Sequence, residues 1–458
     1  MKLNVIFVLV ILLTDISCNN QRNPSLSMTQ IQLLEDTLSV EKEKEPEIDL
    51  NMPEGYVPKA GVKYRQKYDL TTPPVHIDIQ KSIHDVRNIT LSQLADNIEY
   101  VNVGKHRFGV SAQVTPSGIL ASNDDGVWLY SSEGKLIREI YKNICEFTIS
   151  GGWVSYGPGD KYVGITQVRY NEKEDRLWLQ YVNGLNEQHL GYMDMSGKLE
   201  TSTPELKNDM VTLLAPVKPG RVAYGENFVI HQSWRDKAPA TYSMYGDTLC
   251  RFSVGYDSIT SKALRGIGVD DANSYYYHGT HTFRISYSDT LFRVTAPNIL
   301  KPVYVLDVGT SGRATNQGKT TDVKLEEMYI IQSVREDDKY LYVKFSKDYD
   351  CEANRINRKV HFWWGIYDKT KREFFTLPFD SDSNISFEND IDGGMPFWPT
   401  TVGARGEKIS YTSGKSMKKQ LTPAWFEKSK TKDNAKKEKL RNFVRTLKDD
   451  DTVVIIVR

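Results

Sequence analysis

A short phrase recurs along the chain and limits the folds open to it more than any other feature. Each copy joins an aromatic-rich extended run, a tight polar turn and a second extended run. The turns, such as Glu133-Gly134 and Gly246-Asp247, are built from residues that tolerate turn or left-handed geometry. Each phrase therefore predicts a β-hairpin. The copies lie at 128–140, 191–203, 241–254, 283–295 and 364–377.

The spacing of the hairpins indicates a repeated unit. The residues that follow the turns are Leu136, Leu199, Leu249, Leu291 and Phe374, at intervals of 63, 50, 42 and 83. A simple meander would place strands about eight to twelve residues apart. Units of roughly 40 to 50 residues with four strands each are typical of β-propeller blades. With a degenerate sixth unit near 400–415, the sequence predicts an all-β, six-bladed β-propeller, and a β-sandwich with hairpin extensions is the alternative.

The C-terminal part departs from the hairpin pattern. Within 433–448, Leu440, Phe443, Val444 and Leu447 recur at helical spacing, which predicts an amphipathic helix. The β-branched run 452–458 predicts a buried strand. Because an unpaired apolar strand would promote aggregation, we expect this strand to pair into the first blade and close the ring.

The N-terminal residues predict export. Lys2 precedes an apolar run at 5–13, as in a secretory signal, so residues 1–17 are predicted to be a signal peptide. Asp15-Ile16-Ser17-Cys18 resembles a bacterial lipoprotein cleavage site, which makes Cys18 the predicted lipid attachment residue; ordinary cleavage or a buried structural cysteine are the alternatives. Residues 18–70 are predicted to be a lipidated flexible tether, disordered or polyproline-like, and residues 71–458 the propeller.

Composition and motifs limit the classes of function that this chain could have. Lys plus Arg and Asp plus Glu are 59 each, so the chain has no net charge to attract nucleic acid. The phosphate-loop, GxSxG and HExxH motifs are absent from the sequence, and no catalytic residue is predicted. Cys145, Cys250 and Cys351 are widely separated and read as small buried hydrophobic residues. Whether the protein is an enzyme stays open, with the absence of motifs favouring a non-catalytic role.

One acidic stretch offers a candidate site. Glu388, Asp390 and Asp392 alternate with apolar residues, which in a strand would place the acids on a solvated face and the apolar groups behind. The spacing also mimics the start of an EF-hand loop, but Pro399 stands where the loop needs its final glutamate. A formal EF-hand is excluded, no metal ligand is predicted, and an irregular calcium site is the only cofactor alternative.

The same stretch ends in a constrained aromatic pair. Pro396 and Pro399 fix the direction of Phe397 and Trp398, which either fill the core or form a platform at the propeller mouth. A tryptophan beside two carboxylates would suit a glycan or peptide. Asp390, Asp392 and Trp398 are therefore the candidate ligand-binding residues. His278 and His281 are read as two ordinary histidines rather than a metal pair, since residues three apart on a strand face opposite sides.

Several segments together resemble a known family. The segments at 75–103, 157–162, 289–309, 365–375 and 389–399, and the closing LKDDDTVVIIV, are similar to the six-bladed β-propeller lipoproteins of Bacteroidetes-type Gram-negative bacteria. That resemblance implies an exported, lipid-anchored propeller without an established activity.

The expected function is a lipid-anchored binding module of the cell envelope, an outer-membrane lipoprotein facing the periplasm. Its partners would be the membrane, through the N-terminal lipid, and a glycan, peptide or envelope protein; nucleic acid is not expected. The alternatives are a carbohydrate-directed hydrolase or lyase with carboxylates at the central axis, with or without a cation, and a purely structural envelope subunit.

Overall fold

The computed structural model describes the greater part of the chain between residues 61 and 458. Contacts divide the chain into Met1–Glu47 and Ile48–Arg458, and every described residue belongs to the second unit. The predicted signal peptide and Cys18 lie outside the described residues. These are 61–106, 109–146, 148–150, 153–155, 161–172, 175–182, 188–195, 212–217, 220–225, 228–233, 239–243, 246–252, 274–284, 289–308, 329–347, 361–378 and 387–458.

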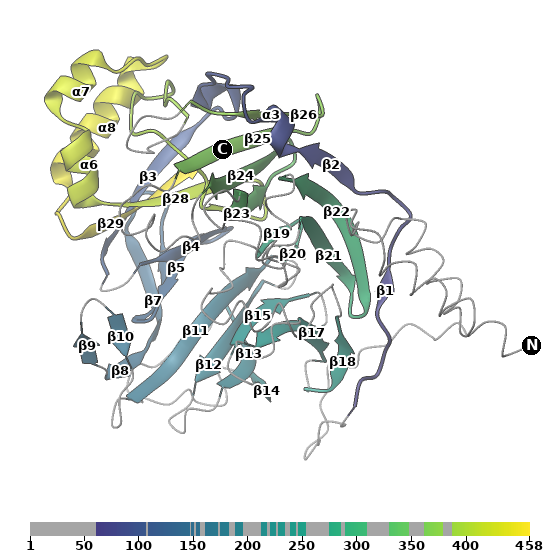
Figure 1. Cartoon of the computed structure of the whole chain (residues 1–458). Helices are drawn as coiled ribbons and strands as arrows, with labels where there is room; N and C mark the ends of the chain where they lie inside the picture. The colour runs from purple at the N-terminus through teal and green to yellow at the C-terminus, as the bar shows by residue number, and fades with distance from the viewer. Residues whose placement is uncertain are drawn as a thin grey trace, which may run out of the picture. The chain divides into compact units, whose positions relative to one another are not determined.

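Six sheets follow one another around an axis, and the predicted six-bladed β-propeller is confirmed (Figure 1). We number these sheets as blades 1 to 6 and give the strands of each from the axis outward. Blade 1 contains β4 (Ser111–Thr115), β5 (Gly118–Asn123), β6 (Gly126–Tyr130) and β7 (Leu136–Lys142). Blade 2 contains β11 (Lys161–Asn171), β12 (Arg176–Val182), β13 (Gln188–Asp194) and β14 (Thr212–Val217). Blade 3 contains β15 (Gly220–Tyr224), β16 (Val229–Ser233), β17 (Ala240–Tyr242) and β18 (Thr248–Arg251).

The second half of the ring has the same order. Blade 4 contains β19 (Ser274–Tyr277), β20 (Thr280–Arg284), β21 (Thr290–Ala296) and β22 (Ile299–Asp307). Blade 5 contains β23 (Tyr329–Glu336), β24 (Tyr340–Lys347), β25 (His361–Asp368) and β26 (Glu373–Thr376). Blade 6 contains β27 (Thr401–Val402), β28 (Lys408–Ser413), β29 (Asp451–Val457) and β3 (Ile98–Lys105). Strand β8 (Ile144–Glu146) extends the edge of β11, and β9 (Thr148–Ser150) pairs with β10 (Trp153–Ser155).

Blade 6 closes the ring with strands from both ends of the described chain. β29 lies between β28 and β3 and is antiparallel to both, which confirms a closing strand. The expected pairing into the first blade is wrong, because β29 completes the last blade by pairing with β3, which precedes blade 1 in the chain. The side chains of β29 alternate between two buried environments, because successive residues of a strand point to opposite faces. Val453, Ile455 and Val457 pack toward blade 5, while Val454 and Ile456 pack toward blade 1. Burial on both faces explains the uninterrupted β-branched run.

Apolar clusters hold neighbouring blades together. Among the described residues there is one cluster between each adjacent pair of blades, so the hydrophobic core is itself a ring. Representative members are Leu129 and Leu177 (blades 1 and 2), Trp178 and Val229 (2 and 3), Ile230 and Leu300 (3 and 4), Leu306 and Phe345 (4 and 5), Ile366 and Ile455 (5 and 6), and Val454 and Ala121 (6 and 1).

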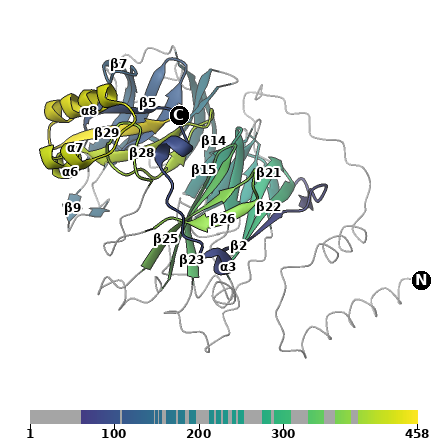
Figure 2. The ribbon, with the colours of Figure 1, turned by 90° about the horizontal axis from the view of Figure 1, so that it is seen from above.

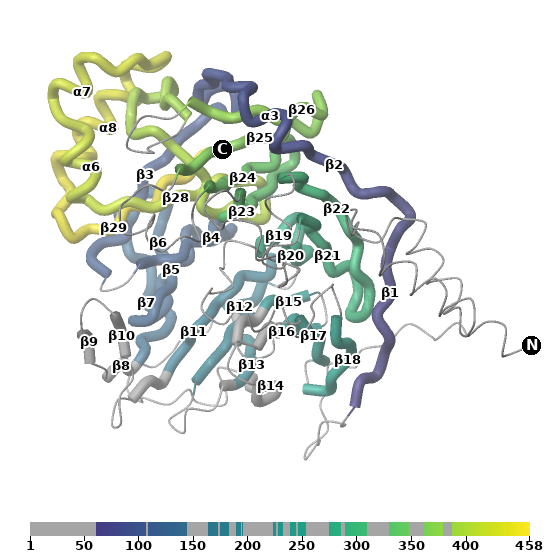
Figure 3. Tube along the Cα trace, viewed as in Figure 1, coloured from purple at the N-terminus to yellow at the C-terminus, as the bar shows by residue number. Residues whose placement is uncertain are grey.

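A belt, residues 61–97, runs along the outer edges of blades 3 to 5 before the chain enters β3 (Figure 3). The backbone N–H of Tyr64 donates to Leu249 on β18, and β1 (Lys67–Tyr68) and β2 (Val75–Asp78) pair in parallel with β22. The backbone N–H of Arg87 donates to Thr376 on β26. Residues 63–70, assigned to the tether from sequence, are thus hydrogen-bonded to blades 3 and 4. The belt also contains α3 (Ile79–Ser82) and the 3-10 helix Leu91–Gln93.

Three helices separate β28 from β29 in the chain: α6 (Gly414–Gln420), α7 (Pro423–Lys428) and α8 (Asn434–Thr446). The amphipathic helix predicted at 433–448 is confirmed as α8, which buries Leu440 and Val444 and begins after the N-cap Asp433. Figure 2 shows the helices beside β28 and β29, and α6 contacts both strands. None of the described helices combines the length and the apolar character that a membrane span requires.

The predicted hairpins fall in different places within their blades. The phrases at 128–140, 241–254 and 364–377 form the outer hairpins β6–β7, β17–β18 and β25–β26. The phrase at 283–295 instead pairs the two middle strands, β20 and β21, of blade 4. The turn predicted at Ser196-Gly197 lies outside the described residues.

Candidate functional site

A cavity of about 510 Å³ lies at the centre of the ring, and we call it the axial cavity. The innermost strand of every blade contributes to its lining: β4, β11, β15, β19, β23 and β27. Volumes of about 300 to 1,000 Å³ are usual for sites that hold small molecules. Because each blade supplies one strand, residues from the whole length of the propeller meet here.

The lining is aromatic and polar. Tyr170, Tyr224, Tyr275 and Tyr276 lie in its walls, together with serine, threonine and glutamine side chains. Among the described lining residues the ionisable groups besides the tyrosines are Arg169, Arg335, Asp124 and His278. The described part of the lining thus contains two cations, one histidine and a single carboxylate.

Arg169 on β11 is the least compensated charge in the lining. Its guanidinium lies 3.0 Å from the centroid of the Tyr276 ring, on the next blade but one. Burial lowers the pKa of Arg169, while Tyr276 acts in the opposite direction. No carboxylate among the described residues forms an ion pair with Arg169. An arginine has five N–H donors, and a single tyrosine cannot satisfy all of them.

Two groups beside Tyr276 also lack full hydrogen bonding. Tyr224 on β15 is 4% exposed, and its hydroxyl has no partner among the described residues. Its backbone N–H donates to the hydroxyl of Tyr276, at 2.7 Å. His281 on β20 is buried beside Tyr276, and burial together with the charge of Arg169 lowers its pKa to about 3. His281 is therefore neutral at physiological pH and adds no charge.

The other ionisable lining residues have interaction partners within the protein. The guanidinium of Arg335 donates to the backbone carbonyls of Thr400 and Val334, at 2.5 and 2.7 Å. Asp124 lies at the end of β5, where burial and then the charge of Asp125 raise its pKa. His278 stands at the β19–β20 turn, 2.7 Å from Asp338. His278 and His281 thus face separate surroundings, as expected of two ordinary histidines.

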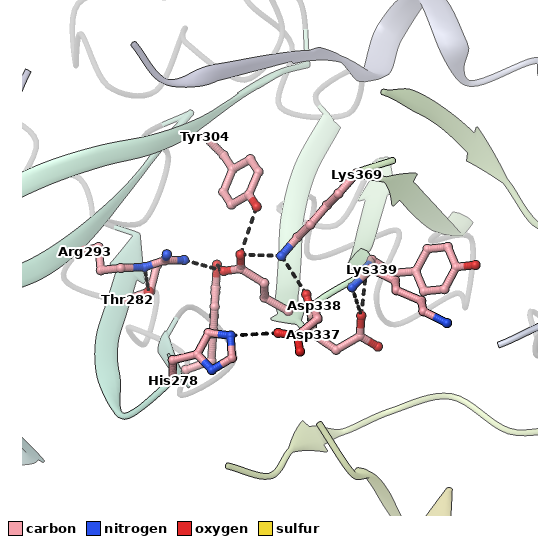
Figure 4. A network of polar contacts seen from close by, with 11 residues as sticks. His278, Thr282, Arg293, Tyr304, Asp337, Asp338, Lys339 and Lys369 are labelled. Carbon is pink, nitrogen blue, oxygen red and sulfur yellow. Dashed lines mark hydrogen bonds and ion pairs between the residues drawn. The ribbon is translucent and has the colours of Figure 1, made fainter. Parts of the chain in front are cut away.

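A buried carboxylate joins blades 4 and 5 beside the cavity (Figure 4). Glu336, at the end of β23, is 1% exposed and accepts four charged or hydroxyl donors. The donors are Tyr275 (2.8 Å), Arg293 (2.6 Å), Tyr304 (2.8 Å) and Lys369 (2.7 Å). Burial and then the charge of Glu336 raise the pKa of both tyrosines, so each remains a donor. All lone pairs of this carboxylate are engaged, which indicates a structural role.

The next residue extends the connection to blade 6. Asp337 accepts a hydrogen bond from the hydroxyl of Tyr342, at 2.8 Å. The same oxygen forms an ion pair with Lys408 on β28, at 3.0 Å. The other oxygen of Asp337 accepts from the backbone N–H groups of Lys339 and Tyr340. Glu336 and Asp337 therefore tie three consecutive blades together at one end of β23.

The predicted ligand-binding residue Asp390 is held by the protein itself. Its carboxylate accepts from the backbone N–H and the hydroxyl of Ser92, at 2.9 and 2.6 Å, and lies 3.5 Å from Lys432. Burial acts to raise the pKa of Asp390, but the bonds from Ser92 and Thr90 and the charge of Lys432 outweigh it, so this pKa lies below its usual value. Asp390 thus connects the belt to the segment before α8.

Asp392 is buried more deeply, at 2% exposure. Its Oδ1 atom accepts from the amide of Asn389 (2.8 Å), the backbone N–H of Gly394 (2.9 Å) and the hydroxyl of Tyr100 (3.3 Å). Burial raises the pKa of Asp392 to about 6 against these bonds. The expected strand is wrong here: residues 389–393 form a turn, because the Asn389 side chain bonds the backbone that follows it.

Trp398 packs within an apolar cluster between blades 5 and 6. Its ring stacks on Phe387, with centroids 5.7 Å apart, and meets Tyr342 edge-on at 5.7 Å. It is half-buried, and like Asp390 and Asp392 it lies outside the lining of the axial cavity. Ligand binding by these three residues stays a prediction.

The described part of the chain contains no cluster of metal-ligating side chains. No group of three or more histidine, cysteine, aspartate or glutamate side chains there could hold an ion. Both oxygens of Asp390 and the Oδ1 atom of Asp392 accept from N–H or O–H donors, whereas calcium needs such oxygens free. Cys250 is fully buried, and burial raises the pKa of its thiol to about 11, which leaves it unreactive at neutral pH.

Sequence reasoning missed the residues of the axial cavity. In the run Tyr275-Tyr276-Tyr277, Tyr275 bonds Glu336, Tyr276 lies against Arg169, and the ring centroid of Tyr277 lies 4.4 Å from the Lys369 Nζ. The run of tyrosines was the available signal. Arg169 gave none, because the sequence does not mark which strand of a blade is innermost.

Comparisons with known proteins find a family model and solved structures to which this chain is similar. The model of a family described as a domain of unknown function (DUF4933) matches residues 59–423. A solved structure from Bacteroides fragilis, described as a candidate exported protein, aligns over 84% of this chain and 99% of its own, with a TM-score of 0.52 and 11% identity. A protein of unknown function from Bacteroides thetaiotaomicron aligns over 70% of each chain, with a TM-score of 0.34 and 11% identity. A search of curated proteins finds no match.

Proposed function

We propose that this chain, which belongs to the DUF4933 family, is a binding protein of the cell envelope that takes its ligand in the axial cavity. The observation that carries the proposal is the composition of the lining. Tyrosine rings and mixed polar groups surround a closed-ring cavity, and the described lining residues contain a single carboxylate, Asp124. Aromatic faces with a few polar groups suit recognition of a sugar or a short peptide.

Blocking the cavity tests the proposal. Thr401 on β27 lines the cavity, and a Thr401→Trp substitution would fill part of it. Thr295 on β21 is exposed and outside the lining, so Thr295→Trp is the matched control. Calorimetric titration with envelope glycan fragments and short peptides should show binding to the wild type and the control but not to Thr401→Trp. Equal binding by both variants would place the site elsewhere.

The alternative is a carbohydrate-directed hydrolase or lyase. The raised pKa of Asp124 is the observation in its favour, since an acid catalyst needs a protonated carboxyl group. Glycoside hydrolysis usually requires a second carboxylate about 5 to 10 Å away, and the described lining residues provide none. Incubation with the same glycans separates the two functions: shortened products that disappear in Asp124→Asn would favour the enzyme.

Export and lipid anchoring belong to the same proposal. The apolar run before Cys18 has the form of a secretory signal, and the similar Bacteroides fragilis protein is described as a candidate exported protein. Acylation of Cys18 would attach the propeller to the outer membrane, facing the periplasm. Detergent partitioning tests the anchor, because the wild type should enter the detergent phase and Cys18→Ala the aqueous phase. Identical partitioning would contradict it.

A further inference from the structure

The axial cavity contains a cation that the described residues do not neutralise. Arg169 borders the cavity and lies against Tyr276, without an ion pair to any carboxylate among the described residues. A partly buried charge without a counter-ion costs stability. The ligand-free protein is expected to bear such a cost at a site where a bound ligand supplies the missing negative charge.

We infer that the axial cavity binds its ligand through a carboxylate group, with the guanidinium of Arg169 as the counter-ion. The inference rests on the proposed function and names the chemistry of the ligand. A guanidinium presents parallel N–H donors that match the two oxygens of a carboxylate. The ring of Tyr276 covers one face of the guanidinium and limits its orientation.

A second unsatisfied donor lies in the same wall. The hydroxyl of Tyr224 is buried without a partner, and the backbone N–H of Tyr224 bonds the hydroxyl of Tyr276. Tyr224 and Tyr276 are therefore fixed relative to one another, and Arg169 lies against the second of them. This hydrogen bond holds the Tyr276 ring in place against Arg169.

The remaining charges do not cancel Arg169. Arg335 is cationic and donates to two backbone carbonyls, and His281 is neutral. Asp124 is the carboxylate of the described lining, and it stands beside another acid, Asp125, rather than beside Arg169. The wall that carries Arg169 therefore favours an anion.

A tyrosine ring indicates what the carboxylate is attached to. Tyr276 is half-buried and lies in the lining with Arg169, and such a ring packs against the apolar faces of sugars. A uronic acid combines a pyranose ring with a carboxylate and fits a cavity of about 510 Å³. D-glucuronate is therefore the probe, and D-glucose, which has the same ring without the charge, is its neutral reference.

Calorimetric titration of the full chain tests the inference. We expect glucuronate to bind the wild type at least about tenfold more tightly than glucose. Arg169→Gln should abolish this preference, while Arg169→Lys, which keeps the charge and loses the fork, should reduce it and serves if the glutamine variant does not fold. Arg176→Gln is the matched control, because Arg176 also lies over a tyrosine ring, 4.9 Å from Tyr192, but outside the cavity.

Each outcome decides between the two claims. Equal affinity for glucuronate and glucose, with both lost in Thr401→Trp, would overturn the inference and leave cavity binding intact. Glucuronate binding that survives in Arg169→Gln and Arg169→Lys would also overturn it. Failure of glucuronate, acetate and inorganic phosphate to bind at concentrations up to about 10 mM would overturn it as well. Glucuronate binding unchanged in Thr401→Trp would contradict the proposed function itself.

Discussion

Glu336 shows at the scale of one residue how the propeller holds neighbouring blades in register. The carboxylate comes from blade 5, while three of its four donors, Tyr275, Arg293 and Tyr304, come from blade 4. A buried ion pair with every lone pair engaged adds little net stability, but removal of one partner is costly. The network therefore specifies how the two blades meet.

A Glu336→Gln substitution should lower the free energy of unfolding by about 3 kcal/mol, because Arg293 and Lys369 would keep their charges without the carboxylate. Urea denaturation measures the change. Glu373→Gln is the matched control, since Glu373 pairs with Arg87 at the exposed rim and its loss should cost less than about 1 kcal/mol. Similar small losses in both variants would contradict a role for Glu336 between the blades.

Asp392 makes stability depend on pH. Its pKa of about 6 in the folded protein lies above the ordinary 3.8, so the folded state binds this proton more tightly than the unfolded chain does. The stabilisation is complete below about pH 4 and is lost as pH rises through about 6, by about 3 kcal/mol in total. Asp392→Asn should remove this part of the pH dependence, as measured by denaturation at several pH values. An unchanged slope between about pH 4 and about pH 7 would count against it.

A substitution at Trp398 distinguishes a packing role of this side chain from a ligand-binding role. Its ring contacts Phe387 and Tyr342 in the cluster between blades 5 and 6. Trp398→Ala should therefore lower the free energy of unfolding by about 3 kcal/mol, with ligand affinity in the axial cavity unchanged. Melting curves and titration on the same sample check both statements. A folded variant with normal stability and lost binding would instead support the platform predicted from sequence.

At the scale of elements, the belt covers edges that would otherwise stay open. Strands β18, β22 and β26 each bond to it, and an exposed edge strand is prone to pair with other chains. The belt also inserts Ile77, Ile79 and Ile83 into the cluster between blades 4 and 5. The belt is therefore part of the folded propeller.

Removal of the belt should destabilise the ring. A chain that starts at residue 90 would lose Ile77, Ile79 and Ile83, each worth about 2 kcal/mol when buried, and should melt lower and aggregate. A chain that starts at residue 60 keeps the belt and is the control. Thermal melting and size-exclusion chromatography make the comparison, and equal melting temperatures would show that the belt is dispensable.

The turn residues made the hairpins predictable. Elements that depend on hydrogen-bond partners far away in the sequence could not be predicted. Gly134 and Gly246 have φ of 83° and 91°, as the predicted turns require. The belt could not be predicted as an element, because its backbone bonds to strand edges far away in the sequence, as Arg87 does with Thr376. Helix α7 was missed although Thr422 and Pro423 give a recognisable helix start.

At the scale of the whole molecule, the repeat predicted the ring but not what the ring encloses. The repeated hairpins and the closing strand define six blades, since each unit must bury both faces against its neighbours. The cavity depends on which strand of each blade is innermost, and Arg169, Tyr224 and Tyr276 come from blades 2, 3 and 4 and meet only when these blades assemble. The predicted ligand-binding residues Asp390, Asp392 and Trp398 share one contiguous segment, and a sequence pattern favours such a group over residues that meet only in the fold.

Closure by β29 is the claim on which the axial cavity depends, and hydrogen–deuterium exchange of the intact protein tests it most directly. Because β29 is bonded on both sides and buried on both faces, its amides should exchange only with global unfolding, together with those of β3. Exchange of residues 452–457 within seconds, while β28 stays protected, would show that the ring is open and would contradict the account.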